Sequence, residues 1–325
     1  MNRHLLFAIK AAISLGLLVY LLGSVDVVEV WQRFLEGQGG FFAVAIVTYW
    51  TVVVLSTIRW KVLLDPLGGK SNLVDLTLSY LVSAFFANFL PSNVGGDVVR
   101  VEEAARAAGS RTASLTVAVV DRIAGFVALY FIAVPAYFLG GPLVQGLSGA
   151  RFILLAFTAL VVILGGLFLF PKPVSHLIAG LRLQRIPAVH RRVLSLQGAL
   201  NAFRANKGAL VNAFLLSLVL QFLGVMYFYF VARALRIPLD LGTSMLMVPL
   251  CTLIQALPIS FNGWGLREGV YVVYFRQVGL PRESALAFSI VAATLVMVLS
   301  VSGLFVWLGR RKPAHETQSP PPAAT

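Results

Sequence analysis

The chain has 325 residues, of which 58% are hydrophobic and only 12% are charged, and its mean hydropathy is +0.86. Soluble domains carry about 25% charged residues, so this composition excludes an ordinary soluble fold and indicates a membrane protein. The charge is basic, with 26 Lys and Arg against 13 Asp and Glu. Such an excess also occurs in nucleic-acid-binding proteins, but in so apolar a chain it is typical of cytoplasmic loops, and we expect no nucleic-acid partner.

Residues that carry metal or acid–base chemistry are scarce. The single cysteine, Cys251, lies in an apolar stretch, and the four histidines lie in tails or in a hydrophilic loop. A disulfide, a histidine-ligated metal centre and a Ser-His-Asp site inside the membrane therefore have no residues to form them. We expect no metal, no cofactor and no enzymatic activity.

Six apolar runs are long enough to cross a hydrocarbon core of about 30 Å, which takes about 20 helical residues. They are 5–23, 41–62, 113–139, 151–171, 208–232 and 284–308. The first resembles a signal peptide, but no small-x-small cleavage pattern follows it, so we expect an uncleaved span. Two further apolar regions, 73–110 and 240–280, are interrupted by Pro, Gly, Asn and charged residues and do not read as clean spans.

The basic residues predict the orientation of these spans. Segment 171–207 carries seven Lys and Arg and no acidic residue, and three basic residues follow the last span. Both regions are therefore expected in the cytoplasm, whereas the acidic segment 24–40 and the uncharged segment 140–150 are expected to face outward. Both termini are then cytoplasmic.

This orientation requires region 73–110 to leave and return on the cytoplasmic side, and region 240–280 to do so on the outer side. The sequence thus predicts an all-α polytopic membrane protein with about six full spans plus two opposed re-entrant hairpins. The hairpins belong to an inverted repeat with units 41–139 and 208–308. A single broken span in each place is the alternative, since it also preserves the orientation of the two ends.

Polar segments outside the spans complete the predicted layout. In the cytoplasmic loop 171–207, apolar residues recur at three- and four-residue steps, as in an amphipathic helix that lies at an anionic interface. We favour the simpler interpretation that the basic residues of this loop are a topology signal. The Pro-rich tail 313–325 is expected to be disordered, which leaves 1–312 as a single transmembrane domain. Arg59 and Lys61 close a span and are expected to reach the cytoplasmic interface.

The two interrupted regions align on their prolines, Pro91 and Pro258. In both, Gly follows at the fifth position and Arg at the ninth position after the proline. Interrupted segments in matching positions of an inverted repeat indicate the midplane site of a transporter. Proline and glycine end one helix and let the chain turn, and the free amides that start the next helix favour an anion. The alternative is a kink within an ordinary helix.

A charged side chain at the bilayer centre costs about 2.5–3.5 kcal/mol, so each one needs a partner or a function. We predict that Arg100 and Arg267 face one cavity and hold the oxygens of a phosphate between two guanidinium groups. The alternative is structural ion pairing, of Arg100 with Asp97 and of Arg122 with Asp121 or another acid. The predicted substrate-binding residues are Asn93, Gly95, Gly96, Asp97, Arg100, Asp121, Arg122, Asn262, Gly263, Arg267 and Glu268.

Three motifs stand out among these residues: Leu-Pro-x-x-x-Gly-Gly-Asp-x-x-Arg (90–100), Asp121-Arg122-x-x-Gly125 and Pro258 with Gly263-x-Gly265-x-Arg267-Glu268. On these motifs the chain resembles, over about 5–308, the flippase-like transmembrane family of lysylphosphatidylglycerol synthase. The resemblance implies a multi-pass protein of a bacterial or archaeal inner membrane that acts on lipids. Only a short tail follows Lys312, so we expect the membrane domain without an aminoacyl-transferase domain and without lysyl transfer.

The predicted function is translocation of a lipid with an anionic headgroup between leaflets, with membrane lipids as partners. Two alternatives stay open. The chain could be a small-solute or ion transporter of the same architecture, or a non-transporting membrane partner of a lipid-modifying or glycosyl-transferring enzyme.

Overall fold

The computed structural model is built from helices throughout the part of the chain that it describes, with no strand there. This part comprises 35–68, 72–89, 93–108, 111–140, 149–169, 206–255 and 263–310, with residues 32, 146, 147 and 203. The elements are α3 (Gly39–Leu64), η1 (Asp65–Leu67), α4 (Leu73–Phe89), α5 (Asn93–Ala108), α6 (Arg111–Leu139), α8 (Ala150–Leu169), α11 (Lys207–Ala234), α12 (Leu241–Gln255), α13 (Leu266–Gln277), α14 (Arg282–Ser300) and α15 (Ser302–Arg310).

Four segments are long and apolar enough to cross a membrane: Gly39–Leu67, Ala113–Leu139, Lys207–Ala234 and Arg282–Arg310. They match four of the predicted spans. At 1.5 Å per residue each is about 40 Å long, which exceeds a hydrocarbon core of about 30 Å. The predicted span 151–171 is helical as α8, but its described side chains end at residue 163. The predicted span 5–23 lies outside the described residues, as do nearly all of loop 171–207 and the tail 313–325, so these remain predictions.

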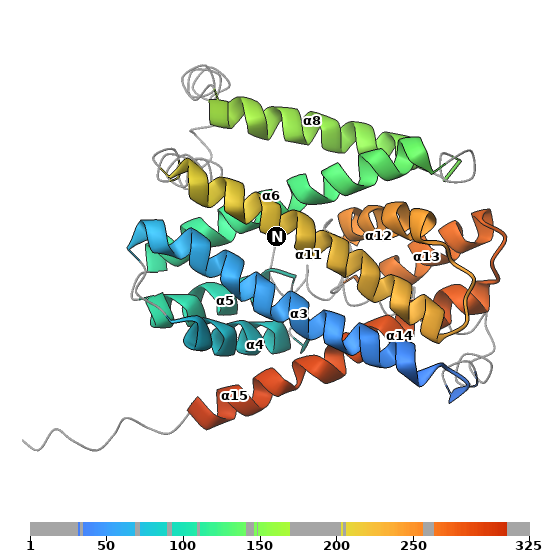
Figure 1. Cartoon of the computed structure of the whole chain (residues 1–325), viewed down its shortest axis with the longest axis horizontal. Coiled ribbons are helices and arrows are strands. Elements are labelled where there is room, and N and C mark those ends of the chain that lie inside the picture. Colours follow the sequence, from blue (N-terminus) through green and yellow to red (C-terminus); the bar gives the residue numbers. More distant parts are fainter. Residues whose placement is uncertain are drawn as a thin grey trace, which may run out of the picture.

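The long helices run between two common ends of the molecule (Figure 1). Helices α3 and α11 are antiparallel, because the Gln38 amide donates to the Ala234 carbonyl at 2.8 Å while Arg59 Nη1 donates to Ser217 Oγ at 2.7 Å. Helix α6 crosses α11, and Gln221 Nε2 donates to the Gly125 carbonyl at 3.3 Å. We call one end of the bundle the Arg310 end, where α15 finishes, and the other the Arg282 end, where α14 begins.

Two pairs of shorter helices fill the space between the long ones. In the first pair, α4 and α5 are antiparallel, since Ser79 Oγ donates to the Glu103 carbonyl at 3.4 Å and Gly96 packs against Ala87. The start of α4 and the end of α5 lie at the Arg310 end, where Arg310 Nη1 is 3.1 Å from Glu103 Oε2. In the second pair, the start of α12 and the end of α13 lie at the Arg282 end, where short connections join them to α11 and α14 (Figure 1).

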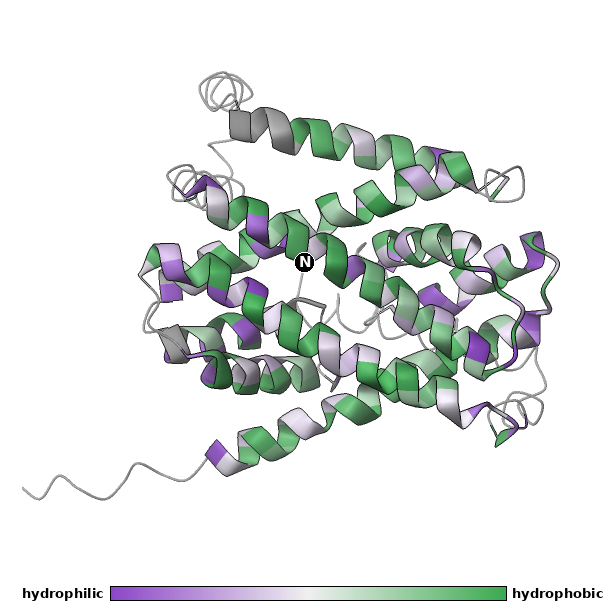
Figure 2. Cartoon of the chain, in the orientation of Figure 1, coloured by the Kyte–Doolittle hydropathy of each residue, from purple (hydrophilic) through white to green (hydrophobic). Residues whose placement is uncertain are grey.

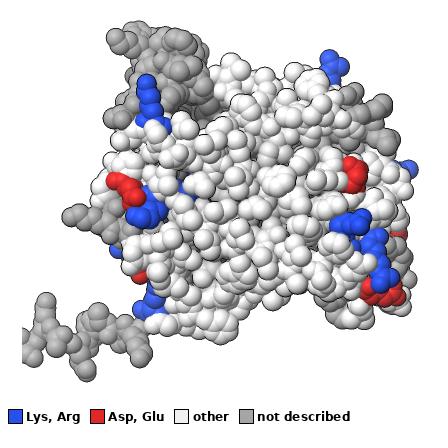
Figure 3. Space-filling view, viewed as in Figure 1, with Lys and Arg blue, Asp and Glu red and all other residues white. Residues whose placement is uncertain are grey.

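Charge and hydropathy follow the same two ends. Hydrophobic residues dominate the middle of the long helices and hydrophilic residues gather near their ends (Figure 2). On the face shown in Figure 3, Lys, Arg, Asp and Glu lie at the two ends with a wide uncharged band between them. This distribution is that of a membrane-embedded helical protein, because the band can face lipid and the ends can face water.

The last span differs from the prediction of one continuous helix over 284–308. A turn at Val301 divides it into α14 and α15. Beyond the turn, Gly303 lies against the backbone carbonyl of Leu81, and any side chain at this position would collide with that carbonyl. The close approach of α15 to α4 therefore depends on a glycine.

Candidate functional site

The centre of the candidate site is a buried carboxylate, Asp121 of α6, which contacts two arginines from other helices. Its Oδ1 lies 2.7 Å from Arg59 Nε of α3, and its Oδ2 accepts a hydrogen bond of 3.4 Å from Arg100 Nη1 of α5. Arg59 also donates to Ser217 of α11 at 2.7 Å. We call Arg59, Arg100, Asp121 and Ser217 the Asp121 cluster; it joins four helices through buried polar contacts.

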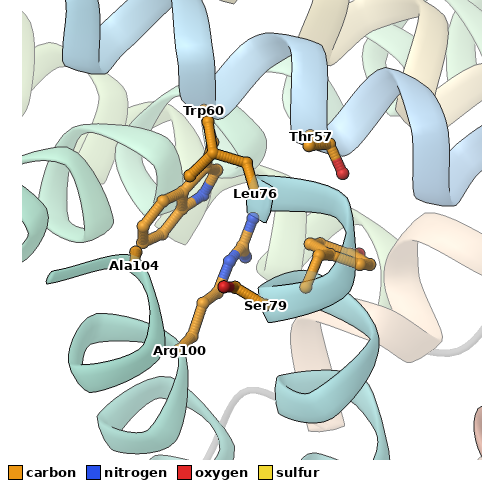
Figure 4. Close-up of a pocket in the computed structure, with 7 residues that line it drawn as sticks. Thr57, Trp60, Leu76, Ser79, Arg100 and Ala104 are labelled. Carbon is orange, nitrogen blue, oxygen red and sulfur yellow. The ribbon is translucent and has the colours of Figure 1, made fainter. Parts of the chain in front are cut away.

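Arg100 is held by aromatic rings as well as by charge. Its guanidinium carbon lies 4.2 Å from the centre of the Trp60 ring and 4.8 Å from that of Tyr80, both within cation–π range. The side chain reaches from α5 into the space between α3 and α4 (Figure 4). Beside it is a cavity of about 10 Å³, which is the size of a single water molecule. Thr57, Trp60, Leu76, Ser79, Tyr80, Arg100 and Ala104 line it.

The charges of the Asp121 cluster do not balance among the described residues. Two guanidinium groups face one carboxylate, so the cluster carries an excess of one positive charge. Arg100 Nε and Nη2 are buried, and neither has a hydrogen-bond partner in the part of the chain that the structure covers. An uncompensated buried cation is costly, and an anion that supplied the missing acceptors would be favoured here.

The depth of the cluster is set by its position on α3. Arg59 lies five residues before Leu64, where α3 ends, which places it about 8 Å inside the Arg310 end of the helix. Helix α3 is 26 residues long, so the cluster is much closer to that end than to the Arg282 end. A ligand that reaches Arg100 therefore has its shortest route from the Arg310 end.

A second buried cluster lies at the start of α13. Glu268 Oε1 accepts hydrogen bonds from Arg267 Nε at 2.9 Å and from Ser289 Oγ at 3.0 Å, and its Oε2 accepts from the Gly265 amide at 2.7 Å. Arg267 lies over the Trp264 ring at 4.8 Å. One arginine faces one carboxylate, so this Glu268 cluster is neutral, and the carboxylate also caps the first turn of α13.

The structure brings some of the predicted residues together and separates others. Arg100 meets Asp121, and Arg267 meets Glu268, but the two clusters have no residue in common. The cavity beside Arg100 is lined from α3, α4 and α5, and none of these lining residues comes from the α12–α13 pair. A cavity shared by Arg100 and Arg267 therefore stays a prediction. Arg122 is exposed on the surface of α6.

The remaining predicted residues lie at the turns of the two helix pairs. Gly96 is buried against Ala87, and Gly263 adopts φ +80°, a left-handed conformation that favours glycine. Asn93, Gly95 and Asp97 belong to α5, but their side chains lie outside the described part, as does the whole of Asn262. The predicted pairing of Arg100 with Asp97 is therefore untested.

The prediction for Arg59 was wrong. It does not reach the interface but is buried, with 7% of its surface exposed, because Asp121 and Ser217 offer it partners inside the bundle. Lys61 does lie at the surface and pairs with Asp65 at 2.9 Å. Trp60, Tyr80, Ser217 and Ser289 were also missed; the available signal was that polar residues such as Ser217 interrupt spans that are otherwise apolar.

The fold and these clusters define a polytopic α-helical membrane protein with charged groups buried between its helices. Comparison with family models identifies the family: the model of the lysylphosphatidylglycerol synthase TM region matches residues 7–303. The chain belongs to this family, which gives it a membrane role related to lipids. Neither the comparison with curated proteins nor that with solved structures finds a match.

Proposed function

We propose that this protein moves a lipid with an anionic headgroup from one leaflet of the membrane to the other. The observation that carries the proposal is the excess positive charge of the Asp121 cluster among the described residues, where two buried nitrogens of Arg100 have no acceptor in that part of the chain. A headgroup phosphate offers several oxygens in a geometry that a guanidinium group binds well. Membership of the family supports a lipid as the source of that phosphate.

In this proposal the two helix pairs are re-entrant hairpins of a six-span protein, and the Arg310 end is cytoplasmic. The headgroup approaches from the Arg310 end, and Arg100 exchanges Asp121 for the phosphate, while the acyl chains stay in the bilayer. The water-sized cavity then represents a closed state, and the bound lipid favours a more open one by its higher affinity for it. A potential that is negative inside contributes about 2.3 kcal/mol per charge per 100 mV and drives an anionic lipid outward.

The proposal is tested by reconstituting the full chain into vesicles that contain a fluorescent phosphatidylglycerol and by bleaching the outer leaflet with dithionite. The wild type should expose inner-leaflet label faster than empty vesicles do. Arg100→Gln should slow this exchange at least tenfold, since it removes a charge-assisted contact of about 1.5–3 kcal/mol.

Arg106→Gln is the matched control. Arg106 lies on the same helix and is paired with Glu103, but its side chain is 75% exposed, so its loss should leave the rate unchanged. The proposal fails if the wild type exchanges lipid no faster than empty vesicles, or if the Arg100 and Arg106 variants behave alike. The latter result would favour a role as a partner of a lipid-modifying enzyme.

A further inference from the structure

A second concave surface lies far from Arg100, between the last part of α6 and the first part of α8. It is a groove of about 550 Å³, which is within the usual range for small-molecule sites. Helix α8 lies at the edge of the bundle (Figure 1). The lining residues run from Tyr130 to Phe138 on α6 and from Arg151 to Thr158 on α8, so the groove belongs to the Arg282 end.

The lining of the groove is mainly apolar, and two of its polar side chains are hydrogen-bonded to each other. Val134, Phe138, Leu154 and Leu155 supply hydrocarbon surface. Thr158 Oγ1 and the Tyr130 hydroxyl lie within hydrogen-bond distance of each other at 3.2 Å. Apart from Tyr137 and Arg151, the remaining residues of the lining are hydrophobic.

Arg151 is the one charged residue among those that line the groove. It is the second residue of α8 and is exposed, and none of the described carboxylates pairs with it. A cation at the mouth of an apolar groove, near the end of a membrane-spanning helix, matches an amphiphile whose negative group lies at the interface and whose tail lies in hydrocarbon.

We propose that this groove binds an anionic phospholipid of the surrounding bilayer, with the headgroup phosphate at Arg151 and one acyl chain along Val134, Phe138 and Leu155. Binding here does not depend on the translocase proposal. If the groove proposal and the translocase proposal both hold, the groove binds lipid of one leaflet and Arg100 receives lipid from the opposite leaflet.

The test is native mass spectrometry of the full chain in neutral detergent, titrated with phosphatidylglycerol or phosphatidylcholine. Arg151→Gln should weaken retention of phosphatidylglycerol about three- to tenfold. It should weaken phosphatidylcholine less, because the choline cation of that lipid already offsets the charge of its phosphate. Leu155→Trp should weaken both lipids, because the larger ring fills the groove. Both positions are exposed, so folding should survive, which gel filtration checks.

Two control variants make the result specific to the groove. Ile163→Trp makes the same kind of change on the same helix at 59% exposure, compared with 57% for Leu155, and Arg276→Gln removes an exposed arginine at the same end of the bundle. Both should bind like the wild type. The proposal is overturned if Arg151→Gln retains phosphatidylglycerol fully, or if either control weakens it as much as its partner does.

The two proposals fail separately. Arg100→Gln should slow exchange between leaflets at least tenfold and leave the Arg151-dependent lipid in place. Loss of that lipid in the Arg100 variant would contradict a separate groove site. If the wild type retains lipid at Arg151 but does not move lipid between leaflets, the translocase proposal is wrong and the groove proposal still holds.

Discussion

Asp121 is the one described carboxylate that holds the charges of Arg59 and Arg100 together. Substituting it by Ala leaves the guanidinium groups of Arg59 and Arg100, whose side chains are 9% and 19% exposed, without the carboxylate that they share. Removing one partner of a buried ion pair costs about 3–5 kcal/mol. We therefore expect Asp121→Ala to lower the free energy of unfolding by about this amount, measured by denaturant titration of the purified protein in detergent.

The control for this prediction is Asp65→Ala. Asp65 is also paired with a cation, Lys61, but its side chain is 49% exposed. An exposed ion pair contributes at most about 1 kcal/mol. Equal destabilisation by the two substitutions would show that Asp121 does not compensate buried charge.

The Glu268 cluster makes a different prediction because its charges balance. Glu268→Gln leaves the Arg267 guanidinium buried without its carboxylate, and we expect it to cost about 3–5 kcal/mol. Adding Arg267→Met removes the unpaired charge, so the double variant should be more stable than Glu268→Gln alone. A double-mutant cycle of thermal unfolding measures the coupling, which we expect to exceed about 1 kcal/mol; additive effects would contradict the ion pair.

Among the helices, the contact between α15 and α4 is the most restrictive. It combines the glycine contact at Gly303 with the reach of Arg310 to Glu103 and Ser79, whose hydrogen bonds measure 3.1 and 3.3 Å. Gly303→Ala must push the two backbones apart, because the blocking atom is a carbonyl oxygen and not a movable side chain. Such overpacking costs about 1–3 kcal/mol.

We expect Gly303→Ala to lower the free energy of unfolding and to make hydrogen exchange in α4 and α15 faster. Gly224→Ala provides the comparison, since a Cβ at Gly224 meets nothing within 4 Å. It should stabilise α11 by up to about 1 kcal/mol, because alanine favours helix more than glycine does. If both substitutions change stability in the same direction, the α15–α4 contact is not as tight as the structure indicates.

Taken over the whole molecule, hydropathy predicted the parts of the fold that depend on local sequence. The spans 41–62, 113–139 and 208–232 are long apolar runs, and each is a helix in the structure. The break at Val301 lies beside Ser302-Gly303, a dipeptide typical of helix kinks and turns. The backbone contact that follows it, between Gly303 and Leu81, was not predictable. A contact of this kind has no signature in a single sequence.

The candidate site was predicted in part for a similar reason. Arg100 and Asp121 were identified because charges are rare in apolar segments, but their contact with each other joins residues from different helices. Arg59 was assigned to the interface because it lies close to the end of a span. Its burial depends on Asp121 and Ser217 from two other helices, and packing of this kind overrides the local rule for charges near span ends.

The placement of the two helix pairs in the membrane is the prediction that concerns the whole chain. If both are re-entrant, the two ends of each pair must lie on one side, with the α4–α5 pair opposite to the α12–α13 pair. Cys251 is the single cysteine of the chain and is buried, so Cys251→Ser gives a cysteine-free background. Exposed positions at the four ends are Asp75, Arg106, Arg236 and Arg276.

Single cysteines at these positions are labelled with a membrane-impermeant maleimide in intact and in lysed cells. We expect Asp75→Cys and Arg106→Cys to react only after lysis, because the basic segments predict that the Arg310 end is cytoplasmic. Arg236→Cys and Arg276→Cys should react in intact cells. If Asp75 and Arg106 label from opposite sides, α4 and α5 do not form in the membrane the antiparallel pair that the structure shows. A headgroup would then have to reach Arg100 through a broken full span and not beside a hairpin.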